Sequence, residues 1–324
     1  MTHQMLPPPE NWTLVTEFVM VGFTGIHEGH LPVFCFFLAI YLLTLLENGI
    51  LVLAVTMEKH LHTPMYFFLI QLSCLDICYT TLTVPKMLAG FVSPSGRTIS
   101  YSVCLTQLYL FTFLGSTECF LLAAMAFDRY MAICVPLRYQ AMVSRNTCLL
   151  LTGGSWLVGF LTPALPIYYL SQLTFCGPNV INHFFCDASP LLVLSCTDIS
   201  QKELVDFLIS LTVLLVSSFI IIMSYANIIS TVLKIHSLAG RHRAFSTCTA
   251  HLTVVSVFYG TLFFMYVRTK IESSVNLNKV VSVFYAIVTP VLNPIIYSLR
   301  NTEVKGALYR VIAKTKLLQW DKQL

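Results

Sequence analysis

Charged residues are scarce in this chain, and their scarcity excludes most classes of protein. Only 10% of the 324 residues are Asp, Glu, Lys or Arg, against about 25% in an ordinary soluble domain. Hydrophobic residues make up 56% of the sequence. A soluble protein of this length could not bury that much apolar surface, so lipid must be the solvent of the chain. The net charge of +4 gives no support to a nucleic-acid partner, and we expect none.

The motifs of common enzyme classes are also missing. The sequence contains no Gly-rich phosphate loop, no zinc-spaced His/Glu pair and no nucleophile elbow in a polar domain. We therefore expect no enzymatic activity. A membrane transporter is the alternative from another class, and it would show repeated halves with Gly- or Pro-interrupted helix pairs. The sequence has no such internal repeat, which disfavours a transporter.

Lys and Arg are absent from the first thirty residues, which favours export of the amino terminus. No basic segment precedes a short apolar core near Met1, so we expect no cleavable signal peptide. We expect residues 1–30 to form an extracellular tail, which carries a predicted glycosylation site at Asn11. Residues 300–324 should form a cytoplasmic tail with a short amphipathic helix.

Long hydrophobic runs fill the sequence between these tails. Crossing a bilayer takes about 20 helical residues, and seven runs are long enough, at residues 31–57, 65–91, 101–127, 148–170, 204–233, 245–267 and 275–299. The runs are continuous rather than alternating apolar with polar residues, which indicates helices and not strands. The sequence therefore predicts an all-α membrane protein, a bundle of seven transmembrane helices over residues 31–299.

The loops between the runs determine the expected orientation. With the amino terminus outside, thirteen of the 19 Lys and Arg residues fall on the inner side and six on the outer side. Positive loop residues concentrate in the cytoplasm. We therefore expect the amino terminus outside and the carboxyl terminus inside.

The same topology sorts the eleven cysteines. Four of them fall in outer loops or at the outer start of the third helix, namely Cys104, Cys176, Cys186 and Cys196. Disulfides persist outside the cell and rarely in the cytosol, so these four predict two disulfides. Four cysteines permit three pairings, and the spacing alone does not choose among them.

Short sequence blocks carry a family resemblance. Asp128, Arg129 and Tyr130 close the third helix, and the seventh ends in NPIIY at residues 293–297. Further blocks are LHTPMYFFL at 61–69, MAFDRYMAIC at 125–134, AFSTCTAH at 244–251 and PVLNPIIYSLRN at 290–301. Together they resemble the tetrapod-type olfactory receptors, a group of rhodopsin-like G-protein-coupled receptors.

The resemblance implies a function and a location. It implies a plasma-membrane receptor that binds a small volatile odorant, activates a G protein of the stimulatory olfactory type and raises cyclic AMP, with membrane lipid around it. A receptor of the same fold for an endogenous metabolite outside the nose remains the alternative. The resemblance also implies disulfides joining Cys104 to Cys186 and Cys176 to Cys196, which would hold the second outer loop over the bundle as a lid.

An activation switch is implied at the inner ends of the helices. A guanidinium at the end of a membrane helix is costly unless it is paired or hydrated, and Asp128 beside Arg129 offers a resting partner. The alternative is an arginine that reaches the interface and only sets topology. The residues assigned to the switch are Asp128, Arg129, Tyr130, Tyr225, His251, Asn293, Pro294 and Tyr297.

A polar cluster is expected in the middle of the bundle. Asp76 lies midway along the second helix and Glu118 midway along the third, with Asn48 and Asn293 expected nearby from the family fold. Two carboxylates in a medium of low dielectric would share a proton or hold a cation such as sodium. A hydrogen-bonded polar core without an ion is the alternative, and both remain open.

The ligand pocket is expected in the outer half of the bundle. The resemblance points to Phe111, Thr112, Gly115, Ser116, Ile209, Ser210, Val213, Tyr259, Leu262, Phe263 and Tyr266. Spacings of three and four place each group on one helix face, and the mostly apolar lining suits a weakly polar ligand. Ordinary helix packing is the alternative for each single residue.

The second outer loop also contains an HxxCD pattern formed by His183, Cys186 and Asp187. Such a pattern could bind a transition metal through a thiolate. An oxidised Cys186 cannot serve as a thiolate ligand, so we predict no transition-metal site. No cofactor is expected, and a sodium ion at the polar cluster stays one of the open alternatives.

Overall fold

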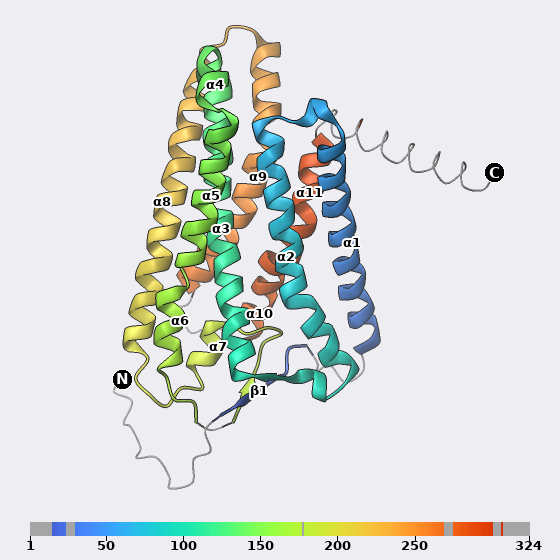
Figure 1. Cartoon of the computed structure of the whole chain (residues 1–324), viewed down its shortest axis with the longest axis vertical. Helices are drawn as coiled ribbons and strands as arrows, with labels where there is room; N and C mark the ends of the chain where they lie inside the picture. The colour runs from blue at the N-terminus through green and yellow to red at the C-terminus, as the bar shows by residue number, and fades with distance from the viewer. Residues whose placement is uncertain (1–14, 24–29, 177, 269–274, 301–305, 307–324) are drawn as a thin grey trace, which may run out of the picture.

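The computed structural model describes residues 15–23, 30–176, 178–268, 275–300 and 306. The predicted glycosylation site Asn11 and almost all of the predicted cytoplasmic tail lie outside these residues. Within them, long helices run side by side along one axis, and a small sheet lies at one end (Figure 1). We call the end with the sheet the sheet end and the opposite end the Arg129 end.

The long helices correspond to the predicted apolar runs. Their bounds are α1 His30–Met57, α2 Pro64–Val92, α3 Tyr101–Cys134, α5 Arg145–Leu161, α8 Ser200–Leu233 and α9 Leu238–Arg268. The last run consists of α10 Val275–Val283, the π-helix η3 Phe284–Val288 and α11 Thr289–Arg300. Shorter helices are α4 Pro136–Met142, α6 Ala164–Ser171 and α7 Ala188–Leu192, and single turns are η1 Lys59–Leu61 and η2 Ser95–Arg97.

Several helices begin where the sequence supplies a suitable first residue. The side chain of Ser100 accepts a hydrogen bond from Val103 at the start of α3, and Ser144 does the same for Thr147 at the start of α5. These contacts satisfy backbone N–H groups that a helix leaves unpaired. Pro64 opens α2, where its missing N–H costs nothing.

Two predicted runs are interrupted in the structure. The run at 148–170 divides into α5 and α6, because Pro163 has no N–H to continue the helical ladder. The run at 275–299 contains the five-residue π-helix Phe284–Val288. A continuous stretch of apolar residues does not reveal such a local change of hydrogen bonding.

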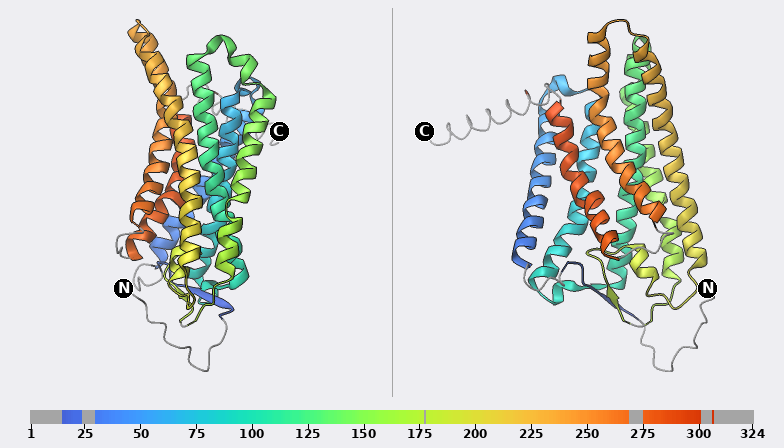
Figure 2. Two further views of the ribbon diagram at one scale, coloured as in Figure 1. Left: turned by 90° about the vertical axis from the view of Figure 1, so that its left-hand side faces the viewer. Right: turned by 180° about the vertical axis from the view of Figure 1, so that it is seen from behind.

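Six helical segments of the described chain are long and apolar enough to cross a membrane, and α9 contributes a shorter apolar segment, Cys248–Phe263. These seven segments coincide with the seven predicted runs. The predicted all-α, seven-transmembrane, multi-pass architecture is confirmed. Figure 2 shows α8 and α9 extending past the other helices at the Arg129 end.

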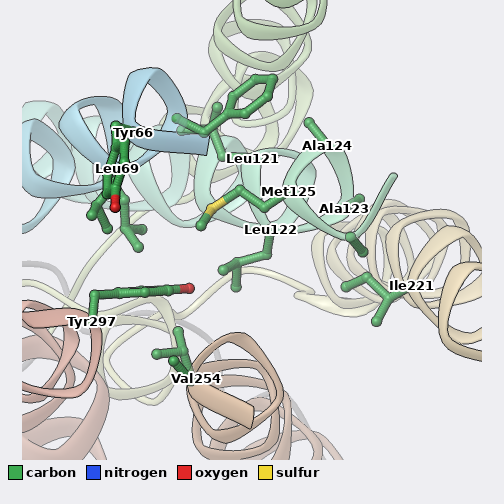
Figure 3. Packing of buried hydrophobic residues seen from close by; sticks show 14 of the residues in the cluster. Tyr66, Leu69, Leu121, Leu122, Ala123, Ala124, Met125, Ile221, Val254 and Tyr297 are labelled. Carbon is green, nitrogen blue, oxygen red and sulfur yellow. The ribbon is translucent and has the colours of Figure 1, made fainter. Parts of the chain in front are cut away.

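The packed interior centres on α3, which contacts α2, α5, α8 and α9. Leu121, Leu122 and Met125 of α3 have no exposed surface, and Figure 3 shows Met125 and Leu122 among side chains from other helices. Truncating such a side chain to Ala typically costs about 2–5 kcal/mol. Large side chains on the outer faces of the bundle, such as Leu150 at 75% exposed, lie outside this packed interior.

A three-stranded sheet closes the sheet end. Its order is β2-β1-β3, with β1 Glu17–Met20 antiparallel to β2 Thr98–Ser100 and parallel to β3 Val180–Ile181. The sheet buries Phe18 completely, with its ring perpendicular to that of Phe175 at 5.6 Å. The sequence does not predict this sheet, because three short strands from distant segments give no periodic signal.

Candidate ligand pocket and inner switch

Two disulfides fasten the loop between α6 and α8, which the sequence predicts to be the second outer loop. They join Cys104 to Cys186, with Cα atoms 5.5 Å apart, and Cys176 to Cys196, with Cα atoms 5.8 Å apart. This is the pairing that the resemblance implies. The amide of Cys186 also donates to the side-chain oxygen of Gln107 at 2.9 Å, so the loop is bound to α3 by a covalent bond and a hydrogen bond.

The loop carries an aromatic side chain onto the expected pocket. Phe185 precedes Cys186, and its ring lies 4.6 Å from that of Phe111 on α3. Tyr79 of α2 meets Phe111 edge-on at 4.9 Å, and Tyr285 lies 5.6 Å from it. Phe111 is therefore surrounded by aromatic rings from the lid, α2 and η3.

Gly115 lies one turn of α3 further from the lid, against the same tyrosine. A Cβ atom at Gly115 would come within 2.5 Å of the hydroxyl oxygen of Tyr79. Ser116 is buried, at 7% exposed, and Thr112 is half-buried. The absence of a side chain at Gly115 leaves room for the Tyr79 hydroxyl.

The expected pocket residues of α8 and α9 divide into two groups. Val213, Tyr259 and Leu262 pack against the main hydrophobic core, and the Tyr259 hydroxyl donates to the carbonyl of Cys119 at 3.3 Å. Phe263 is 70% exposed, apart from its neighbours on the helix.

The other residues expected to line the pocket are Ile209, Ser210 and Tyr266. Ile209 and Ser210 are half-buried on α8. The side chain of Tyr266 lies outside the described residues. Most of the described members of the predicted set are therefore buried or half-buried within the bundle, whereas Phe263 is exposed.

Sequence reasoning missed three aromatic residues around Phe111: Tyr79, Phe185 and Tyr285. A signal existed for Phe185, because a residue next to a disulfide-bonded cysteine must lie close to that cysteine's partner helix. For Tyr79 and Tyr285 the sequence offered only aromatic residues in apolar runs, which are equally typical of ordinary core packing.

His183 holds the lid against the seventh helical segment. Its ring nitrogens lie 3.1 Å from the Phe185 carbonyl oxygen and 3.2 Å from the Ser282 hydroxyl. Burial lowers the pKa of His183, the charge of Lys279 lowers it further, and Asp187 and the Phe185 carbonyl oppose the shift. The imidazole is therefore neutral near pH 7 and makes both contacts as a neutral ring.

Two residues of the HxxCD pattern are engaged in other contacts. Cys186 is bonded to Cys104 and has no thiolate to offer, and His183 faces Ser282. Among the described residues, no group of three His, Cys, Asp or Glu side chains has the proximity a metal ion requires.

The polar cluster assembles in the middle of the bundle. The side-chain nitrogen of Asn293 donates to both carboxylate oxygens of Asp76, at 3.1 and 3.2 Å. That of Asn48 donates to the carbonyls of Thr44 and Pro290, at 3.0 and 3.2 Å.

Two oxygen atoms of the cluster lack a hydrogen-bond partner. They are Oε1 of Glu118, which is 3% exposed, and the side-chain oxygen of Asn48, which is fully buried. A buried acceptor without a donor costs about 1–3 kcal/mol. Both oxygens are free to accept a proton donor or a cation, which is the chemistry a sodium ion or a carboxylic acid proton would supply.

A chain of hydrogen bonds crosses the bundle on the Arg129 side. The Tyr225 hydroxyl of α8 lies 2.7 Å from Nδ1 of His251 on α9, and Nε2 of His251 lies 3.1 Å from the Leu122 carbonyl oxygen of α3. Since a carbonyl only accepts, Nε2 carries the proton and Nδ1 accepts from the tyrosine. Three helices are thereby joined through one neutral imidazole.

The acidic residue of the DRY block has a different partner from the one expected. The Asp128 carboxylate accepts from the Tyr139 hydroxyl of α4 at 2.8 Å, and no ion pair within 4.0 Å joins Asp128 to Arg129 in the described chain. Burial and the neighbouring carboxylate raise the pKa of Tyr139, so its hydroxyl stays protonated. The expected resting pair is replaced by a link between α3 and α4.

The other switch residues lie near Arg129 and the core. The Nε atom of Arg129 is buried without a hydrogen-bond partner, as is the hydroxyl of Tyr297. Figure 3 shows the Tyr297 ring pointing towards Met125 and Leu122. Pro294 is buried on α11, and Tyr130 is half-buried on α3.

A family model and the similar proteins of known sequence all indicate the same family. The olfactory receptor family model matches residues 34–315. Human olfactory receptor 6Q1 is 66% identical over 310 residues, which cover 95% of this chain and 98% of that protein. Human olfactory receptor 6B1 is 51% identical, covering 93% and 96%, and rat olfactory receptor 226 is 50% identical, covering 92% of each.

Proposed function

The chain belongs to the olfactory receptor family and is an odorant receptor, and from this premise we propose how its parts perform that function. A small, mostly apolar volatile molecule binds in the outer half of the bundle, next to Phe111 and under the Phe185 lid. Binding favours an active arrangement of the Arg129 end, which activates a G protein of the stimulatory olfactory type and raises cyclic AMP.

The observation that carries this proposal is the hydrogen-bonded chain Tyr225–His251–Leu122 beside Arg129. Each neutral hydrogen bond contributes about 0.5–1.5 kcal/mol, so the two bonds together hold the inner part of α9 by a few kcal/mol at most. A ligand that binds the active arrangement more tightly by that amount would shift the equilibrium. Outward movement of α9 then exposes Arg129 to the G protein.

The composition of the pocket supports an apolar ligand. Aromatic rings surround Phe111, and the polar groups of the predicted set are the aliphatic hydroxyls of Thr112, Ser116 and Ser210 and the phenolic hydroxyls of Tyr259 and Tyr266. A pocket of this kind favours molecules that bury apolar surface and make few hydrogen bonds. Phe111 offers no charge, so a tightly ion-paired amine is not the expected ligand.

The polar cluster supports a second element of the mechanism. The carboxylates of Asp76 and Glu118, with Asn48 and Asn293, bind a sodium ion or share a proton in the resting receptor. Asn48 and Glu118 each retain an oxygen without a hydrogen-bond partner, which fits either occupant. Loss of the ion or proton accompanies activation.

The proposed location is the plasma membrane, with the amino terminus and the sheet end outside. The distribution of Lys and Arg supports this orientation. The first turn of α3 and the segment with β3 and α7, which carry the disulfide cysteines, lie at the sheet end (Figure 1), where an oxidising exterior would preserve the two disulfides. The Arg129 end then faces the cytoplasm and its G protein.

The test is a cyclic AMP assay of cells that express the receptor, run against a broad panel of volatile molecules. We expect at least one ligand-dependent response in the native chain and none in Arg129→Ala at equal surface expression. Arg138→Ala, an exposed arginine on α4, is the matched control and should respond normally. A full response in Arg129→Ala would refute the assigned switch, and solute flux without any cyclic AMP change would favour a transporter.

A further inference from the structure

A groove lies at the Arg129 end, away from the ligand pocket. It has a volume of about 760 Å³ and is bounded by α1, η1, α2, α4 and α5. Figure 1 places α4 and the first turns of α2 and α5 at this end of the bundle. Its volume falls within the roughly 300–1,000 Å³ typical of small-molecule sites, and it contains none of the residues assigned to odorant binding or to the switch.

The walls of the groove change from polar to apolar along the helices. Polar residues lie where the helices begin: His62 and Thr63 before α2, and Ser144 and Arg145 at α5. Apolar residues follow further along the same helices, namely Phe67, Ile70 and Leu149. The candidate membrane spans Pro64–Val92 and Arg145–Ser171 both begin here. The groove therefore crosses the boundary between headgroups and hydrocarbon, with its polar part at the headgroup level.

The polar part of the groove favours an anion. Arg145 and His62 line it, the imidazole of His62 with its Nε2 3.3 Å from the Thr56 carbonyl oxygen, and none of the lining residues, all within the described chain, is Asp or Glu. The amino-terminal ends of α2 and α5 add partial positive charge. Thr63, the residue before α2, makes no side-chain capping hydrogen bond.

We propose that this groove is a binding site for an anionic phospholipid. The phosphate lies at Arg145 and His62, and one acyl chain lies along Phe67, Ile70 and Leu149. Charge selects an anionic headgroup, and the apolar length of the walls selects a lipid over a soluble anion, which would leave that surface without a partner. Lipid is also the medium that meets α2 and α5 at this depth. The groove shares Tyr139 with the contact to Asp128, so its occupant touches the helix next to the switch.

The test uses the purified receptor in nanodiscs of phosphatidylcholine doped with a photoreactive phosphatidylserine or a photoreactive phosphatidylcholine. A basic side chain near a membrane surface contributes about 1 kcal/mol to binding an anionic lipid, which is roughly a fivefold difference in affinity. We expect phosphatidylserine to label residues 62–70 and 144–149 about five times more than phosphatidylcholine does. This mapping needs no variant. Equal labelling by the two lipids would overturn the proposal.

Variants test the two parts of the site separately. Arg145→Gln should reduce the phosphatidylserine preference about fivefold, whereas Arg138→Gln, which removes the same charge from an exposed position on α4 outside the groove, should leave it unchanged. Ile70→Trp should reduce labelling by both lipids, because the larger side chain fills the apolar part. Equal loss in the two arginine variants would indicate diffuse surface charge and overturn the site. Protection by inorganic phosphate as complete as that by unlabelled phosphatidylserine would also overturn it.

Discussion

The hydroxyl of Tyr225 lies 2.7 Å from Nδ1 of His251, and the two rings are stacked with centroids 5.7 Å apart. The histidine is fully buried, and its other nitrogen contacts the Leu122 carbonyl at 3.1 Å. One side chain thus connects α8 and α9 to α3, the helix that carries Arg129. Any motion of α9 away from α3 must break at least one of these bonds.

Replacing this histidine should raise basal signalling. His251→Phe keeps a planar ring and removes both hydrogen bonds, whereas Tyr225→Phe removes one. Each hydrogen bond contributes about 0.5–1.5 kcal/mol. The loss of one hydrogen bond should therefore shift the resting-to-active equilibrium towards the active state by roughly 2- to 13-fold. Cyclic AMP without ligand, measured per receptor at the cell surface, should therefore rise more in His251→Phe than in Tyr225→Phe. A fall below the native basal level in both variants would mean that the chain stabilises the active arrangement.

A methyl group at Gly115 should disturb the ligand pocket. In Gly115→Ala the new Cβ would come within 2.5 Å of the Tyr79 hydroxyl oxygen, while the next ring atom stays at 3.8 Å. Tyr79 must move, and its movement disturbs the contact between Tyr79 and Phe111. We therefore expect ligand potency to fall by about tenfold or more, which corresponds to a loss of about 1.4 kcal/mol in binding free energy.

The double variant identifies the cause. Tyr79→Phe removes the clashing oxygen, so Gly115→Ala combined with Tyr79→Phe should recover most of the potency lost by Gly115→Ala alone. Gly154→Ala on α5, where nothing lies within 4 Å of the added atom, is the control and should match the native dose-response curve. No recovery in the double variant would place the damage elsewhere than the Tyr79 hydroxyl.

Acid should loosen the lid through His183. Its pKa is lowered in the folded state, mainly by burial, so the unfolded chain binds a proton more readily than the folded chain. The contribution of His183 to the free energy of unfolding is then fully present above its unfolded pKa of about 6.5. This contribution decreases as the pH falls towards the folded pKa. The thermal unfolding temperature of the purified receptor should therefore drop between pH 7.5 and pH 5.5.

His183→Gln should weaken that pH dependence, because an amide does not titrate in this range. His236→Gln, an exposed histidine between α8 and α9, is the matched control and should retain the native slope. Should His183→Gln and the native receptor lose stability in parallel, the acid sensitivity would arise from other groups.

Sodium should stabilise the resting receptor. With the proposed ion held by Asp76 and Glu118, replacing potassium by sodium should raise the thermal unfolding temperature and lower basal cyclic AMP. Glu118→Gln should abolish the sodium response, because it removes one charge and keeps the side-chain shape. Identical melting curves in the two salts would instead favour a shared proton or an ion-free polar core.

The sequence allowed much of the fold to be predicted, since seven runs of sufficient length require seven crossings whatever their neighbours are. It failed at local details: the division at Pro163, the π-helix at residues 284–288 and the sheet built on β1. These details depend on backbone hydrogen bonds and on contacts between distant segments. Hydrophobic runs carry no information about either.

The site was predicted unevenly for the same reason. His251 and Tyr225 were assigned to the switch from their sequence blocks, and the structure gives them a shared hydrogen bond. Asp128 was assigned a resting partner next to it in sequence, yet its carboxylate faces Tyr139. Adjacent residues on a helix point about 100° apart, so proximity in sequence is a poor guide to pairing.

By itself, the sequence determined that this is a membrane protein with seven transmembrane helices and that it belongs to the olfactory receptor family. Composition, the length of apolar runs and short motifs are local properties, so each can be read from the sequence alone. Tertiary structure alone decided that Phe185 and Tyr79 enclose Phe111, that His251 joins three helices, and that the groove at Arg145 changes from charged to apolar. Each of these depends on side chains from separate helices meeting at distances of a few ångströms. Only the packed chain fixes such distances.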